Sequence, residues 1–244
     1  MGRIVITVSF GCSVSNTKKI KEGTVMFYKK TFLLKTTTLV LGFCCMVIFS
    51  SSAGLAKESP YNATQHYINN VMQLFLDYDI CSEKKIGPEE KKALRRDLSK
   101  MAGKIFDFDY MCRKAVGPYW RVFTDKQRNQ AVNLFTALLE ENYFGKLLEH
   151  MQEIQRLCGE NIRVTGQEML SSDKAVVKSI IVYGDNEYPV NYIMHEKAGK
   201  WQIYNVVIEG VSLIENYSSQ FREILGRNKP KAFLQKLQDK VENK

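Results

Sequence analysis

The sequence lacks the short motifs that usually mark an enzyme. No glycine-rich phosphate loop, GxSxG nucleophile motif or HExxH metal motif occurs in its 244 residues. No CxxC pair occurs either, and the three histidines, His66, His150 and His195, are scattered without partners at metal-ligand spacing. The sequence therefore predicts no enzyme, and neither a metal nor another cofactor.

A strong charge of one sign is also missing from most of the chain. The net charge is +9, but residues 1–56 hold seven Lys and Arg residues against one acidic residue. The remainder is close to neutral and gives little support for binding a phosphate backbone. We expect no nucleic-acid partner.

Residues 26–56 have the pattern of a secretory signal peptide. Lys29, Lys30 and Lys35 precede an apolar run over 39–49, and small residues follow up to Ala56. The run is short for a bilayer span. We predict cleavage after Ala56, with cleavage after Ala53 as one alternative and an uncleaved signal anchor as another. The mature protein is then exported to the periplasm.

Residues 1–25 do not fit a signal peptide, because they precede its basic region and contain an acidic residue. The stretch Lys21-Glu22-Gly23 is how a purine-rich ribosome-binding site would read if translated, and Met26 follows closely. We expect translation to start at Met26 and residues 1–25 to be an upstream extension. Pyrimidine-rich codons at 21–23 would refute this.

Three of the six cysteines, Cys81, Cys112 and Cys158, lie beyond the signal peptide. In an oxidising compartment any two of them can pair and leave the third free.

The first half of the mature chain has helical periodicity. Apolar stripes predict a helix ending near Asp79 and a second one starting at Pro88. Asp107 is expected to cap a short helix that Gly117-Pro118 stops. Thr124 and Gln127 form a capping box that opens the longest helix, expected to run to about Leu157.

The second half changes to the period of strands. Four runs, over 163–170, 174–183, 187–196 and 200–209, are separated by short turns and predict an antiparallel meander, with an edge or bulge near Pro189. A helix is expected directly after Gly210 and another from Pro230. We therefore predict one α+β domain over 57–244, with a four-stranded or slightly larger meander packed against a helical layer.

Apolar residues occur on both faces of the predicted strands. In the last strand, strict alternation puts Trp201, Ile203 and Val207 on one face and Tyr204, Val206 and Ile208 on the other. A sheet covered by helices explains this as core, and a cavity needs helices that stand off one face.

Three segments in order resemble the MlaC, or toluene-tolerance, family of periplasmic phospholipid-binding proteins. They are the signal peptide, the stretch 106–147 and the stretch 201–221. The second contains FDFDYM, Gly117 with Trp120-Arg121, and the Thr124 capping box; the third is WQIYNVVIEGVSLIENYSSQF, with Asn205 where Asp is more usual.

The resemblance implies a soluble carrier that moves phospholipid between the inner and outer membranes, with acyl chains in an apolar cavity between sheet and helices. It implies two further partners. One is an inner-membrane ABC transporter complex, engaged through its membrane-anchored substrate-binding subunit. The other is an outer-membrane lipoprotein complex. Because each buried CH₂ is worth roughly 0.8 kcal/mol, the tails need enclosure and the head group needs little specific contact.

On the resemblance and the strand alternation, we predict that the following residues bind lipid: Phe135, Leu139, Tyr143, Val177, Ile181, Val190, Tyr192, Met194, Tyr204, Val206, Ile208 and Val211. Trp120 and Arg121 are candidates for the pocket mouth. Asn205 in the row Ile203-Asn205-Val207 is the reason for preferring the other face of its strand.

The sequence also allows two competing hypotheses. The same fold could bind another apolar ligand, such as a solvent, a hopanoid or a sterol-like lipid. A small hydrolase would have to use Asp107, Asp109 and His195, although helix capping explains both aspartates more simply.

Overall fold

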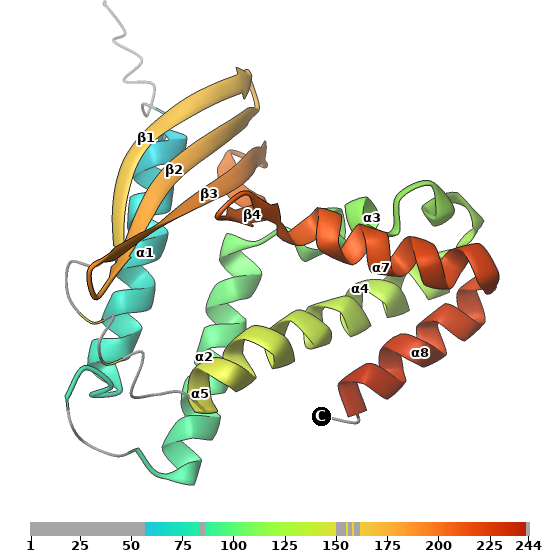
Figure 1. Ribbon diagram of the computed structural model, residues 1–244, viewed down its shortest axis with the longest axis horizontal. Helices are drawn as coiled ribbons and strands as arrows, with labels where there is room; N and C mark the ends of the chain where they lie inside the picture. Colours follow the sequence, from blue (N-terminus) through green and yellow to red (C-terminus); the bar gives the residue numbers. More distant parts are fainter. Residues whose placement is uncertain (1–56, 83–85, 150–154, 156–157, 159–161, 243–244) are drawn as a thin grey trace, which may run out of the picture. The chain divides into compact units, whose positions relative to one another are not determined.

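The computed structural model describes residues 57–82, 86–149, 155, 158 and 162–242. Within this part, five strands form one antiparallel sheet in the order β1-β2-β3-β4-β5, with helices before and after it in sequence (Figure 1). The predicted α+β class and the meander are thereby confirmed. The expected signal peptide, 26–56, and the expected extension, 1–25, lie outside the described residues.

The helices begin where local capping signals predict. Ser59, Asp107 and Thr124 each accept a backbone N–H of the following helix, and Gln127 completes the capping box with Thr124. The helices before the sheet are α1 (Pro60–Asp77), α2 (Pro88–Ile105), α3 (Phe108–Val116), the 3₁₀ turn η1 (Gly117–Val122), α4 (Asp125–Glu140), the π turn η2 (Glu141–Gly145) and α5 (Lys146–Glu149). Those after it are α7 (Leu213–Arg227) and α8 (Pro230–Glu242).

None of the helices in this described part is both long enough and apolar enough to cross a bilayer.

The sheet consists of β1 (Ile162–Ser171), β2 (Lys174–Tyr183), β3 (Asn186–Lys197), β4 (Lys200–Ile208) and β5 (Val211–Ser212). The sequence predicted a helix directly after Gly210. This prediction is wrong, because the short strand β5 lies between Gly210 and α7. Glu209 and Gly210 have positive φ of 49° and 82°. They form a two-residue turn of the type that joins hairpins, and Val211 pairs back with Ile208.

Pro189 lies inside β3, which has a neighbour on both sides. It pairs with Ile180 of β2, while its carbonyl accepts the Glu209 N–H at 3.0 Å. Since the N and C=O of one residue point to the same neighbouring strand, the absent N–H of proline faces the end of β4. The sequence predicted an edge or a bulge near Pro189. The structure has a local edge there, at the end of β4, and no bulge, because the register does not shift at Pro189.

A β-bulge in β4 overturns the strict alternation predicted for this strand. Ile193 pairs with Asn205 and Met194 pairs with Ile203, so Tyr204 is the extra residue. Residues that pair directly in an antiparallel ladder share a face. Trp201 and Ile203 consequently share a face with Val206 and Ile208, whereas Tyr204 does not.

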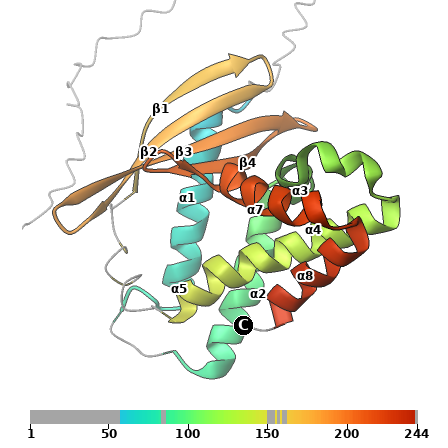
Figure 2. The same ribbon diagram turned by 45° about the vertical axis from the view of Figure 1, so that its right-hand side comes forward.

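The described residues bury three apolar clusters. The first lies among α3, α4, α7 and α8 and contains Phe135, Phe221 and Phe233. The second lies between the sheet and α1, which run side by side in Figures 1 and 2, and it contains Ala63 of α1 with Met194 and Trp201. The third joins α1, α2 and α5. The space between the first two clusters is where the candidate site lies.

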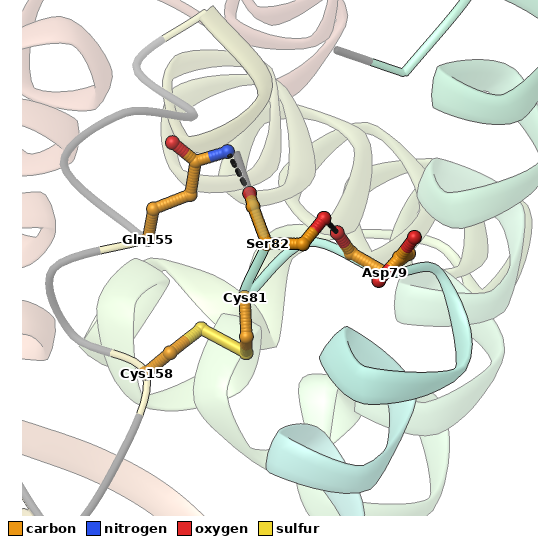
Figure 3. Close-up of a disulfide and its surroundings, with 5 residues drawn as sticks. All are labelled: Asp79, Cys81, Ser82, Gln155 and Cys158. Atoms are coloured by element: carbon orange, nitrogen blue, oxygen red, sulfur yellow. Dashed lines mark hydrogen bonds between the residues drawn. A yellow bond between two sulfur atoms is a disulfide. The ribbon is translucent and has the colours of Figure 1, made fainter. Parts of the chain in front are cut away.

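A disulfide joins Cys81 and Cys158, which settles the pairing that the sequence left open. Gln155 donates a hydrogen bond to the Ser82 carbonyl at 2.7 Å beside it, as Figure 3 shows. Cys112 is free and completely buried, and burial raises the pKa of its thiol. The thiol is therefore protonated and unreactive at neutral pH.

Candidate functional site

An apolar cavity of about 390 Å³ lies between the sheet and the helical layer. Its sheet wall comes from β2, β3 and β4, and its helical wall from α3, α4 and η2, while β5 and the start of α7 complete the lining. The lining residues are Phe106, Phe108, Met111, Leu139, Glu140, Tyr143, Phe144, Ile181, Val190, Tyr192, Val206, Ile208, Val211, Ser212, Leu213 and Asn216.

The sheet wall is one set of cross-strand neighbours. Tyr192 pairs with Val206, and Val190 pairs with Ile208, so all four side chains project from the same face. Burial raises the pKa of the Tyr192 phenol, an effect that the hydrogen bond with Ser179 partly offsets. The phenol therefore stays neutral at physiological pH.

Asp107 positions the α3 wall against the sheet. Its carboxylate accepts the Tyr110 N–H as the helix cap at 3.1 Å, and its backbone N–H donates to the Ile203 carbonyl at 3.0 Å. The same carboxylate accepts a hydrogen bond from Lys197 at 2.7 Å and lies 3.1 Å from His195 Nε2. The side chain of Asp107 thus ties the start of α3 to β3, and its backbone N–H ties it to β4. Phe106 and Phe108 lie on either side of it in the cavity wall.

The charge state of Asp107 follows from these contacts. Burial by itself would raise its pKa, because Asp107 is only 4% exposed. The hydrogen bonds from Lys197 and Tyr110, with the charges of Lys197 and His195, outweigh burial and hold the pKa below the usual value. Asp107 is thus an ionised anchor at neutral pH.

The helical wall includes a π turn. Leu139 and Glu140 end α4, and Tyr143 and Phe144 follow in η2. Tyr143, Ile208 and Val211 are 47%, 47% and 66% exposed although they line the cavity. Large apolar side chains that are half exposed mark this end as the mouth.

The turn into α7 closes the cavity beside that mouth. Asn205 Oδ1 accepts the Ile214 N–H at 3.0 Å, and its Nδ2 donates to Ser212 Oγ at 2.9 Å. Ser212 in turn caps α7 by accepting the Glu215 N–H at 3.1 Å. Both Asn205 and Ser212 are buried, and their polar groups are hydrogen-bonded. Asn205, which stands where Asp is more usual, therefore stabilises the start of α7.

The family model for the MlaC protein matches residues 76–239 of this chain. The chain belongs to the MlaC family.

Individual relatives agree with this membership at low identity. The chain is 21% identical over 210 residues to the intermembrane phospholipid transport system binding protein MlaC of Haemophilus influenzae, covering 84% of this chain and 92% of the relative. It is 23% identical over 177 residues to the toluene tolerance protein ttg2D of Pseudomonas putida, covering 71% and 76%.

A solved structure has the same fold. It is the phospholipid-binding protein of Ralstonia solanacearum in complex with a phospholipid, with a TM-score of 0.60 and 19% identity. The match covers 76% of this chain and 98% of that one.

The structure brings most of the predicted lipid-binding residues of this MlaC family member around this apolar cavity. Those that line it are Leu139, Tyr143, Ile181, Val190, Tyr192, Val206, Ile208 and Val211. The remaining predicted residues lie elsewhere. Phe135 is buried in the helical cluster, and Val177 and Met194 are buried between α1 and the sheet.

Tyr204 lies on the opposite face from the cavity because of the bulge. Its ring packs edge-on against Tyr110 at 5.0 Å and against His195 at 5.3 Å. Trp120 and Arg121 belong to η1 and do not line the cavity; Trp120 stacks on Phe123 at 6.0 Å, with the Arg128 guanidinium over its ring.

Several lining residues were not predicted, namely Phe106, Phe108, Met111, Glu140, Phe144, Ser212, Leu213 and Asn216. Phe108 and Met111 are on the apolar face of the predicted short helix, so the sequence pattern was sufficient to predict that this face lines the cavity. Phe144 was missed because the π turn η2 changes the helical phase after Glu140.

Of the hydrolase candidates, Asp107 and His195 do meet, but Asp109 is exposed on α3 and does not join them. The Asp107 carboxylate is used by the helix cap and Lys197. In the described part of the chain, no group of three or more His, Cys, Asp and Glu side chains has the arrangement of a metal site.

Proposed function

We propose that this chain is a periplasmic phospholipid carrier that holds acyl chains in the apolar cavity and moves lipid between the inner and outer membranes. The single observation behind the proposal is the cavity itself. Its walls are apolar, and each CH₂ group that moves from water into such a cavity contributes about 0.8 kcal/mol. An acyl chain that fills the cavity is therefore stabilised in proportion to the length enclosed.

The chemistry of the lining fits acyl chains. The two cavity walls are almost entirely aliphatic or aromatic, and the polar residues Glu140, Ser212 and Asn216 are few. Burial of CH₂ groups is non-directional, so a wall of this kind accepts tails of several lengths. The half-exposed mouth at Tyr143, Ile208 and Val211 leaves room for a head group at the solvent.

The relatives support the same ligand. One bears the name of an intermembrane phospholipid transport binding protein, and the solved Ralstonia solanacearum protein is a complex with a phospholipid. We assign lipid contact to the predicted residues that line the cavity, together with Phe106, Phe108, Met111 and Phe144. For Phe135, Val177, Met194 and Tyr204 we assign a packing role instead.

The remaining parts of the proposal concern location and partners. Export by the signal peptide over 26–56 agrees with the Cys81–Cys158 disulfide, since disulfides persist in oxidising compartments. The partners are an inner-membrane ABC transporter complex, reached through its membrane-anchored substrate-binding subunit, and an outer-membrane lipoprotein complex. We propose no enzymatic activity and no nucleic-acid partner.

Native mass spectrometry of the protein purified from the periplasm tests the function. We expect a population carrying diacyl phospholipid, and we expect the delipidated protein to take phospholipid up from vesicles. A protein that is uniformly empty and takes up no lipid would refute the proposal. Extraction of a hopanoid, a sterol-like lipid or an aromatic solvent in place of phospholipid would support the alternative apolar ligand.

A further inference from the structure

The long helix that forms one cavity wall changes its phase at η2. Ala131, Phe135 and Leu138 of α4 point into the helical cluster. In an uninterrupted α-helix, with 3.6 residues per turn, the same stripe would continue through Asn142 and Gly145. Those positions are polar or lack a side chain, and the apolar residues come later, at Tyr143, Phe144, Leu147 and Leu148.

The π turn resolves this mismatch. A π turn holds one more residue than an α turn, so it rotates the following residues by about 100° relative to an unbroken helix. Leu148 thereby reaches the cluster formed with α1 and α2, to which Phe144 also packs. Tyr143 and Phe144 come to lie in the cavity wall behind Leu139 and Glu140.

Two side chains of η2 fix this turn to its neighbours. Glu141 forms an ion pair with Arg95 of α2 and is 27% exposed. Asn142 Nδ2 donates to the Tyr217 hydroxyl of α7 at 2.9 Å. The turn is therefore held from both sides, by α2 and by α7.

Gly145 leaves room for the Glu141 carboxylate of this pair. A Cβ at position 145 would lie 2.9 Å from Glu141 Oε1, closer than such atoms normally approach. A side chain here requires the mobile end of Glu141 to shift, and its carboxylate is the group that holds Arg95. By contrast, a Cβ at Gly103 of α2 would meet nothing within 4 Å.

We propose that Gly145 and Arg95 are positioning residues that set how much of the cavity beside η2 is open to lipid, and hence the acyl-chain length that the protein accepts. This inference rests on the proposed function. Without the Arg95–Glu141 pair, η2 loses its tie to α2, and the rings of Tyr143 and Phe144 are no longer held in their places in the wall. The nearest unfilled space is the cavity, so the rings enter it and shorten it.

The expected consequence is a shift in chain-length preference. Each methylene that the shortened cavity no longer encloses lowers the affinity about fourfold. Long-chain lipids should therefore lose affinity relative to short-chain lipids, while short-chain binding persists.

The test compares Gly145→Ala and Arg95→Gln with two matched controls, Gly103→Ala in α2 and Arg96→Gln, whose side chain is 75% exposed on the same helix. Each delipidated protein is offered mixed phosphatidylcholine vesicles with myristoyl, palmitoyl or stearoyl chains, and the bound lipids are quantified by mass spectrometry. Thermal unfolding of each variant is measured alongside.

We expect the stearoyl-to-myristoyl ratio to fall at least about fourfold in Gly145→Ala and Arg95→Gln, and to stay at the wild-type value in both controls. An unchanged ratio in the folded variants, even with a lower melting temperature, would overturn the inference and leave the π turn a purely structural feature. If Gly145→Ala does not fold, Arg95→Gln still tests the inference, because Arg95 is half exposed and its substitution should leave the fold intact. A wild-type protein that binds none of the lipids would instead refute the proposed function.

Discussion

Replacing Asp107 with Asn should make the stability of the fold less dependent on pH. The Asn side chain keeps an oxygen that can accept the Tyr110 N–H, so the cap on α3 survives. It loses the negative charge that faces Lys197 at 2.7 Å and His195 at 3.1 Å. The substitution therefore separates the ionic part of the anchor from its capping part.

The size of the effect follows from the contacts. A hydrogen bond to a charged group contributes about 1.5–3 kcal/mol, so Asp107→Asn should lower the free energy of unfolding by about 2 kcal/mol at pH 7. Asp107→Ala removes the cap as well, worth about 1 kcal/mol, and should cost about 3–4 kcal/mol.

The sign of the pH dependence is set by the lowered pKa of Asp107. A carboxylate whose pKa is lower in the native state stabilises the fold above its ordinary pKa, near 4, and this contribution is lost as the pH falls through the native value. The difference in free energy of unfolding between the wild type and Asp107→Asn should therefore be complete at pH 7 and smaller at about pH 3.

Urea unfolding at both pH values measures this difference. The control is Asp109→Asn, because Asp109 is exposed in the same first turn and should lose only its interaction with the helix dipole, about 0.3–1 kcal/mol. A difference for Asp107→Asn that stays constant between the two pH values, or a control effect of equal size, would refute the reasoning.

Three further groups of substitutions test the packing of the fold. Met194→Ala should lower the free energy of unfolding by about 2–5 kcal/mol in urea without changing the lipids bound, because Met194 is fully buried away from the cavity. Ile181→Ala, by contrast, should reduce lipid uptake from vesicles with a smaller loss of stability, because Ile181 lines the cavity. Replacing both Cys81 and Cys158 with Ser should cost about 4 kcal/mol, since the disulfide closes a separation of 77 residues; equal urea midpoints for the oxidised wild type and the double variant would contradict this. Asn205→Asp should be tolerated because an oxygen still accepts the Ile214 N–H, while Asn205→Leu should cost about 1–3 kcal/mol by leaving that N–H and Ser212 without their partner, as thermal unfolding would measure.

The sequence by itself determined the features that depend on neighbouring residues. The capping box at Thr124 and Gln127 predicted the start of α4, and Asp107 predicted the start of α3, because a cap bonds to the backbone only two or three residues away. The meander followed from short turns between strands of period two. These local rules were enough for the fold class and for most of the sheet wall.

The tertiary structure decided which side chains meet. Asp107 and His195 are 88 residues apart in sequence and 3.1 Å apart in space, and nothing in their local sequence predicts that contact. The pairing of Cys81 with Cys158 also depends on where two distant segments pack. Contacts of this kind follow from the packing of whole elements.

Two single-residue insertions show where the sequence patterns gave the wrong wall. The bulge at Tyr204 turns the first half of β4 over, and the π turn before Gly145 rotates Phe144 into the cavity. Each changes the phase of a periodic pattern by one residue, a change that is small locally but moves every later side chain to another face. What holds each insertion is a partner on another element, such as Arg95 for Glu141, so only the packed fold determines the shape of the cavity.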